Sequence, residues 1–146
     1  MSLTKNRGDR ITDFFAFENS LRNGVYVAGG DFNGDLLSDI VVGAGPGGGP
    51  RVQVFEAKSL INTPEAPTSL INFFGFSSTS RQGVRVAVKN VDGDAIPDLL
   101  IGEGAGNISR IRTYAGGKLD AMKSPNLIDD TVLFDDFSSL NGAQVG

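Results

Sequence analysis

One acidic segment of nine residues occurs twice in this chain, and this repetition constrains its fold more than any other feature. Residues 31–39 read Asp-Phe-Asn-Gly-Asp-Leu-Leu-Ser-Asp, and residues 90–98 read Asn-Val-Asp-Gly-Asp-Ala-Ile-Pro-Asp, at an offset of 59 residues. Oxygen-bearing side chains occupy positions one, three, five and nine of both segments, and glycine occupies position four. Because glycine adopts left-handed backbone conformations at little cost, each segment is expected to form a tight loop.

Loops of this composition suit a calcium ion, which takes roughly six to eight oxygen ligands. Position seven needs to offer only its main-chain carbonyl, so its side chain can turn toward the core. The alternative is a plain hairpin turn, since Asp, Asn and Gly all favour turns. Two copies in the same register favour the metal, because unneutralised carboxylates repel one another. The candidate ligands for two calcium sites are Asp31, Asn33, Asp35, Leu37 and Asp39 in the first loop, and Asn90, Asp92, Asp94, Ile96 and Asp98 in the second.

The repetition extends well beyond the acidic loops. At the same offset, Phe-Phe-Ala-Phe at 14–17 corresponds to Phe-Phe-Gly-Phe at 73–76, and Gly-Val-Tyr-Val-Ala at 24–28 corresponds to Gly-Val-Arg-Val-Ala at 83–87. A period of this size indicates a repeat architecture, in which each unit buries its apolar faces against its neighbours.

Each unit is predicted to hold four strands, because short apolar or alternating runs are separated by turn residues. Four-stranded units of this length are typical of β-propeller blades, so we expect an all-β fold. The expected strands are 24–30, 40–43, 51–55 and 69–74 in the first unit, and 83–89, 98–102, 108–114 and 131–134 in the second. The expected division is a tail at 1–9 and one repeat domain at 10–146, made of an outer strand of a preceding blade within 10–23, blades at 24–82 and 83–141, and the start of a third blade at 142–146.

Composition agrees with this fold and excludes several kinds of function. Twenty glycines against two methionines favour short strands and tight turns. Without cysteine or histidine, the 146-residue chain has no thiolate metal site and no histidine-activated nucleophile. A formal charge of −4 and the absence of a basic run argue against nucleic acid as a partner. No stretch resembles a signal peptide or a membrane span, so any export signal is expected elsewhere, and no membrane insertion is expected.

These pieces together resemble the FG-GAP (VCBS-type) repeat of integrin α-subunit propellers and of bacterial secreted propeller proteins. The residues that carry the resemblance are Phe74-Gly75, the acidic loop at 31–39, and Gly-Ala-Gly-Pro at 43–46. The resemblance implies that calcium is bound between the first two strands of each blade by the ten candidates above. It also implies a secreted or cell-surface location and a role in scaffolding or adhesion. The family often has glycine at the sixth loop position, where this chain has Leu36 and Ala95, so strain and weaker binding are expected there.

The leading interpretation is therefore a calcium-binding propeller segment that is not an enzyme. Two alternatives stay open: a lectin-like propeller that binds glycans, and a fragment of a calcium-dependent polysaccharide lyase. Propellers close with about four to eight blades, so two blades cannot close a ring. The outer faces of both blades are expected to expose apolar side chains, and unpaired strands are expected at 10–15 and 142–145. We therefore expect a homo-oligomer or further blades from a longer parent chain, with a protein or glycan as ligand.

Overall fold

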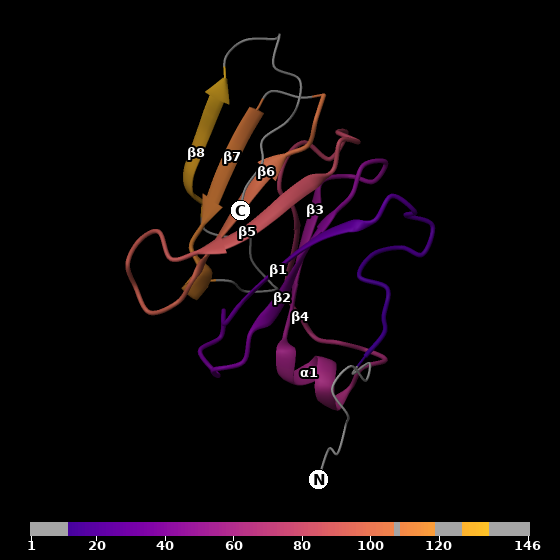
Figure 1. Ribbon diagram of the computed structural model, residues 1–146, viewed down its shortest axis with the longest axis vertical. Coiled ribbons are helices and arrows are strands. Elements are labelled where there is room, and N and C mark those ends of the chain that lie inside the picture. Colours follow the sequence, from indigo (N-terminus) through magenta and orange to yellow (C-terminus); the bar gives the residue numbers. More distant parts are fainter. Residues whose placement is uncertain (1–11, 107–108, 119–126, 135–146) are drawn as a thin grey trace.

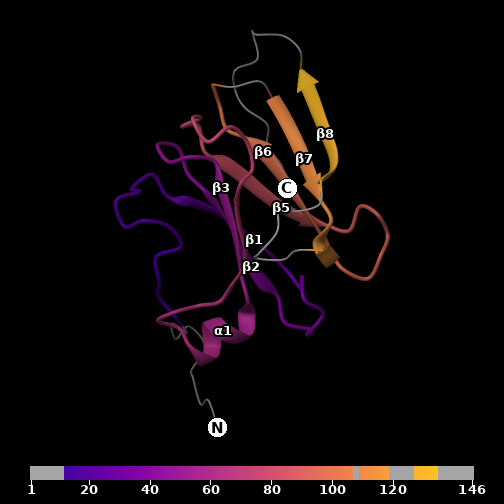
Figure 2. The same ribbon diagram turned by 180° about the vertical axis from the view of Figure 1, so that it is seen from behind.

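The structure is a computed structural model that describes residues 12–106, 109–118 and 127–134. Two four-stranded antiparallel sheets account for most of it, one sheet per repeat (Figures 1 and 2). Each sheet follows the order of the chain, which agrees with the expected all-β class. The first sheet consists of β1 Val25–Gly30, β2 Asp39–Ala44, β3 Arg51–Phe55 and β4 Ser69–Phe74. The second sheet consists of β5 Val84–Lys89, β6 Asp98–Glu103, β7 Ser109–Tyr114 and β8 Leu127–Phe134.

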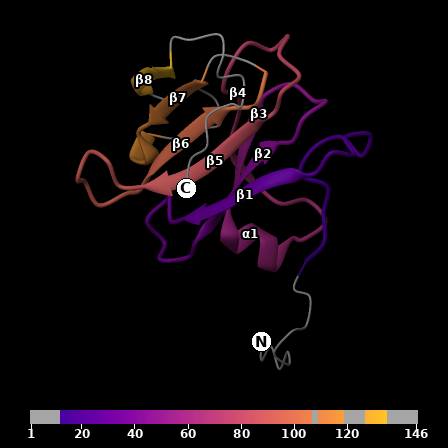
Figure 3. The ribbon, with the colours of Figure 1, turned by 45° about the horizontal axis from the view of Figure 1, so that its top comes forward.

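The two sheets pack face to face through β5, which lies against β1 and β2 (Figure 3). We call the face of the first sheet that carries Val42, and the repeat-equivalent face of the second sheet that carries Ile101, the front face; the opposite faces are the rear faces. The front face of the second sheet covers the rear face of the first, as adjacent repeat units are expected to do. The resulting core is made of Phe32, Val41, Val52, Val54, Ile71, Phe76, Val84, Val86, Leu99, Ile101 and Tyr114.

A glycine allows the sheets to approach closely at the centre of this contact. A Cβ atom on Gly43 of β2 would lie 2.3 Å from the carbonyl oxygen of Val84 in β5. Real Cβ atoms do not approach a backbone oxygen this closely, so the packing of the two sheets requires glycine at this position.

The front face of the first sheet is covered by the chain's own N-terminal segment. Phe17 and Leu60 are buried there with Val42, and Phe14 and Leu21 pack beside them. The expected outer strand within 10–23 is wrong for the described part, because residues 12–23 contain bends and turns but no strand. This segment packs its aromatic side chains onto a sheet face, whereas a strand would need a sheet edge with which to pair. The apolar face expected to be open on this blade is therefore partly closed. The expected strand at 142–145 lies outside the described residues.

Two short helical turns were not predicted. Helix α1 spans Ala57–Asn62 and the 3₁₀ turn η1 spans Gly116–Lys118, each directly after the third strand of its sheet. A six-residue helix is marginal by itself, so tertiary contacts must hold it. Leu60 supplies the apolar contact, and the Ser59 hydroxyl accepts a hydrogen bond from the Thr68 amide at 2.8 Å. Among the described residues, no helix has the length and apolar character needed to cross a membrane.

Candidate functional site: two acidic loops

The acidic loops lie where the sequence predicted them, between the first two strands of each sheet. The first loop joins β1 to β2 and the second joins β5 to β6, so that Asp39 and Asp98 are the first residues of β2 and β6. Antiparallel pairing places the two ends of each loop side by side, as in the pair Gly30↔Asp39. Each loop is therefore a closed hairpin connection on a rigid base.

The first loop wraps its backbone around its first acid. The Asp31 carboxylate accepts hydrogen bonds from the amides of Gly34 at 2.7 Å, Asp35 at 3.1 Å and Leu36 at 2.7 Å. The Asp35 carboxylate accepts one from the amide of Leu37 at 2.9 Å. Gly34 makes the turn with a φ of 77°, in the left-handed region expected for position four.

The second loop repeats this arrangement with an asparagine in the first position. The Asn90 side-chain oxygen accepts from the amide of Gly93 at 2.8 Å, and its side-chain amide donates to the carbonyl of Asp94. Asp94 in turn accepts from the amide of Ile96 at 2.8 Å. The Gly93 φ of 80° matches that of Gly34. The two loops therefore share one local geometry.

The acid at position nine differs from the others, because it is fully buried. Asp39 and Asp98 are both 0% exposed. Asp39 accepts from the amides of Phe32 and Ala57, both at 2.9 Å. It thereby connects the start of its loop to the segment that follows β3. Burial raises the pKa of Asp39, these two amide bonds oppose the rise, and the negative charges of Asp35 and Asp31 add to it.

Asp98 makes the equivalent connection in the second repeat. Its carboxylate accepts from the amides of Val91 at 2.7 Å, Asp92 at 3.2 Å and Gly116 at 3.1 Å. Ala57 and Gly116 occupy equivalent repeat positions. Position nine therefore has an observed structural role in both repeats, and its predicted role as a metal ligand stays a prediction.

The remaining loop oxygens suit calcium in type, but they are not gathered around one point. Asn33, Asp35, Asp92 and Asp94 are exposed. In the described part of the chain, no three His, Cys, Asp or Glu side chains are grouped so as to hold a metal ion. The donors are hard oxygens on short loops closed by backbone hydrogen bonds, which is the chemistry that calcium prefers. The residues present therefore fit calcium chemically, provided that the exposed acids can draw together.

Two features of the loops differ from or extend the sequence prediction. The side chain of Leu37 does not turn to the core, since it is 41% exposed, whereas Ile96 is half-buried. Glu56, which follows β3, was not among the candidates, yet its carboxylate lies 3.5 Å from the Asn33 side-chain amide. An acid directly after the third strand was the available signal, because antiparallel pairing places the end of β3 beside the start of β2.

The expected strain at position six is present in the first loop but not in the second. Leu36 has a φ of 68° and is the one non-glycine residue with positive φ among those the structure describes. Its side chain is 92% exposed, so no packing compensates for the conformation. The left-handed region costs a non-glycine residue about 1–2 kcal/mol. Ala95, at the same repeat position, avoids this region.

Leu36→Gly is therefore expected to stabilise the protein by about 1 kcal/mol, measured by chemical denaturation in EGTA. The matched control is Ala95→Gly, which relieves no strain and should destabilise by about 0.5–1 kcal/mol because glycine increases the entropy of the unfolded chain. Equal effects of the two substitutions would contradict the assignment of strain to Leu36.

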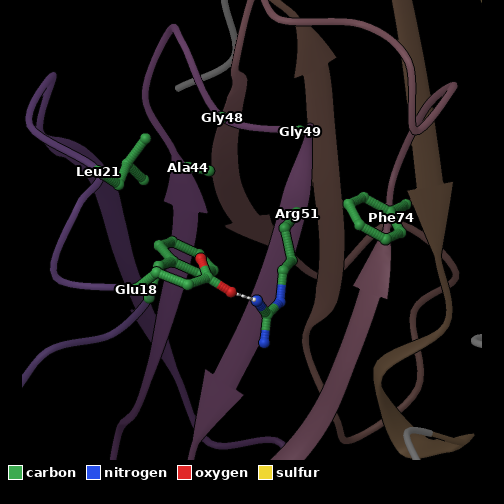
Figure 4. A pocket seen from close by; sticks show the side chains of 8 residues that line it. Glu18, Leu21, Ala44, Gly48, Gly49, Arg51 and Phe74 are labelled. Carbon is green, nitrogen blue, oxygen red and sulfur yellow. Dashed lines mark hydrogen bonds and ion pairs between the residues drawn. The ribbon is translucent and has the colours of Figure 1, made fainter.

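A pocket of about 170 Å³ lies on the front face of the first sheet, where Leu21 and Ala44 line one part and Gly49 and Phe74 another (Figure 4). An ion pair crosses it, with Arg51 donating to Glu18 at 2.6 Å. A backbone hydrogen bond at Glu18 and the bond from Arg51 lower the pKa of that carboxyl. None of the predicted loop ligands lines this pocket.

Comparison with known proteins agrees with the repeat seen in the fold and loops. The chain is 28% identical over 126 residues to integrin alpha-8 of Gallus gallus, which covers 80% of this chain. This similarity supports an integrin-like repeat. The chain spans 12% of the length of integrin alpha-8, so the match concerns a small part of that protein. No family model and no solved structure matches the chain.

Proposed function

We propose that this chain is a calcium-binding, non-enzymatic FG-GAP-like propeller segment of a secreted or cell-surface protein, with a role in scaffolding or adhesion. The observation that carries the proposal is that two loops 59 residues apart share both their oxygen positions and their hydrogen-bonded geometry. The similarity to integrin alpha-8 supports the adhesion role and the cell-surface location. The absence of histidine and cysteine from the sequence supports a non-enzymatic role.

The side-chain oxygens at positions one, three and five would hold the ion in each loop, together with the carbonyls of Leu37 and Ile96. The bound cation would neutralise the exposed acids, whose mutual repulsion otherwise opposes closure of the loop. The buried acids at position nine would fix the base of the loop through the backbone amides that they already accept. In this proposal the ion stiffens the connection between the first two strands of each blade.

Calcium is therefore expected to raise the stability of the folded protein in a saturable way. An ion that binds only the native state adds about 2.7 kcal/mol per site at a hundredfold excess over its Kd. Thermal unfolding in EGTA, in calcium and in magnesium measures this effect. Magnesium should stabilise less, because it requires a tighter octahedral site. An unfolding midpoint that is the same in EGTA and in saturating calcium would contradict the proposal.

The two sites can be separated by substitution of exposed ligands. Asp35→Ala and Asp94→Ala should each reduce the calorimetric stoichiometry from two ions to one. The matched control is Asp13→Ala, which removes an exposed acid outside both loops and should leave the stoichiometry at two. A stoichiometry of two in either loop variant would remove that loop from the proposal.

A further inference from the structure

Two valines of β1 are exposed where their repeat counterparts in β5 are buried. Val25 and Val27 are 46% and 61% exposed, whereas Val84 and Val86, which occupy the same positions in the second repeat, are 0% and 7% exposed. The difference arises because β5 packs against the rear face of the first sheet, and no sheet of the described chain packs against β1 in the same way. The front face of the first sheet therefore has an uncovered strip along β1.

The rest of this front face already has the arrangement of its covered counterpart. Phe14 meets Phe55 edge to face with ring centroids 5.0 Å apart, and Phe73 meets Tyr114 in the same way at 5.1 Å. The interplanar angle is 71° in both pairs. A front face that contacts a neighbouring sheet in the second repeat is thus reproduced in the first, with the neighbour missing only at β1.

The contact between the two sheets depends on a glycine, and the second sheet has one at the same place. Gly43 allows β5 to approach the rear face of the first sheet. Its counterpart on the rear face of the second sheet is Gly102, which is also buried. Leu100 and Ile111 lie beside it on that face and are half-buried. The rear face of the second sheet therefore offers the same apolar, glycine-centred surface.

A backbone hydrogen bond between the sheets can be reproduced in the same way. The Gly47 amide of the first repeat donates to the carbonyl of Arg81 at 2.8 Å. The counterparts are Gly106 and Arg22, and Gly106 has the same φ of 100° as Gly47. Its amide is thus held in the conformation that makes this bond within the chain.

Two side-chain pairs at the interface exchange members between the repeats. The Arg85 guanidinium lies 5.7 Å from the ring centroid of Tyr26, and these two residues are themselves repeat equivalents. A front face bearing Tyr26 that met a rear face bearing Arg85 would pair the same cation with the same ring.

The second exchange concerns size. Val88 of β5 fills the space beside Gly30, where a Cβ atom would lie 2.6 Å from it. The counterpart of Val88 is Gly29, and the counterpart of Gly30 is Lys89. Small meets large in both combinations, so a second copy of this chain fits the first without a clash at this point.

We propose that the front face of the first sheet binds the rear face of the second sheet of another copy of this chain. The contact joins two different surfaces head to tail, so copies can add in succession until a ring closes. This inference rests on the apolar faces and not on calcium, so it stands or falls separately from the function proposed above.

Light scattering after size-exclusion chromatography, performed on the full chain over a range of concentrations, tests the proposal. The expected result is a mass above that of one chain, which falls to one chain in Val27→Asp. The matched control is Val91→Asp, since Val91 is a 51% exposed valine of the second acidic loop and lies off this face. It should leave the mass unchanged. A wild-type chain that stays monomeric at all concentrations would overturn the proposal, as would a Val27→Asp variant with unchanged mass.

A mixing experiment identifies the partner surface. Leu100→Glu places a charge on the rear face, and Arg85→Glu serves if that variant does not fold by circular dichroism. Each variant alone should be monomeric, because each lacks one half of the contact. A mixture of Val27→Asp with the rear-face variant should form a dimer and nothing larger, since one intact junction remains. A mixture that stays monomeric would show that the occupant of the front face is something other than this rear face.

Discussion

Asp98→Ala is expected to lower the free energy of unfolding by about 3–5 kcal/mol in EGTA. The side chain is 0% exposed and accepts hydrogen bonds from three backbone amides. Hydrogen bonds to a charged group contribute about 1.5–3 kcal/mol each, and an amide left buried without a partner costs about 1–3 kcal/mol. The loss is a large fraction of the roughly 5–15 kcal/mol that stabilises a typical domain.

The control is Asp94→Ala, because Asp94 is exposed and belongs to the same loop. In EGTA it should change the unfolding free energy by less than about 1 kcal/mol. In saturating calcium it should lose the stabilisation of one site as well. If Asp98→Ala does not fold, Asp98→Asn retains one acceptor oxygen and should cost less. Equal stability of the Asp98 variants and the wild type in EGTA would show that this residue does not anchor the loop.

Gly43→Ala should destabilise the protein by about 3 kcal/mol, because the added methyl group would lie 2.3 Å from the backbone oxygen of Val84. Backbone cannot swing aside as a flexible side chain can, so the two sheets must separate and lose contacts in the shared core. Urea denaturation followed by circular dichroism measures the change.

Gly29→Ala is the matched control on the neighbouring strand. A Cβ atom at Gly29 would meet nothing closer than 3.6 Å, and Gly29 does not have a positive φ. Alanine should therefore be neutral or stabilising by up to about 1 kcal/mol, through the lower entropy of the unfolded chain. A Gly43→Ala variant as stable as Gly29→Ala would show that the sheets are not packed as closely as described.

The sequence alone determined the eight strands, their grouping into two units, and the position of both acidic loops. This was possible because strand alternation and turn chemistry are local, and because the second repeat tested each assignment made in the first. The left-handed glycines at position four followed from the same local chemistry. Similar residues 59 positions apart adopt similar conformations because they have similar neighbours in both repeats.

The tertiary structure decided what the sequence pattern could not. Residues 12–23 cover a sheet face instead of forming a strand, and α1 exists because Leu60 has a core to enter. Asp39 and Asp98 have the same chemistry as the exposed loop acids, yet they are buried and bonded to amides 18 residues further along the chain. The register of the second and third strands brings those amides into reach. Burial and partners over such distances follow from how strands pair and sheets pack, so no local pattern of residues records them.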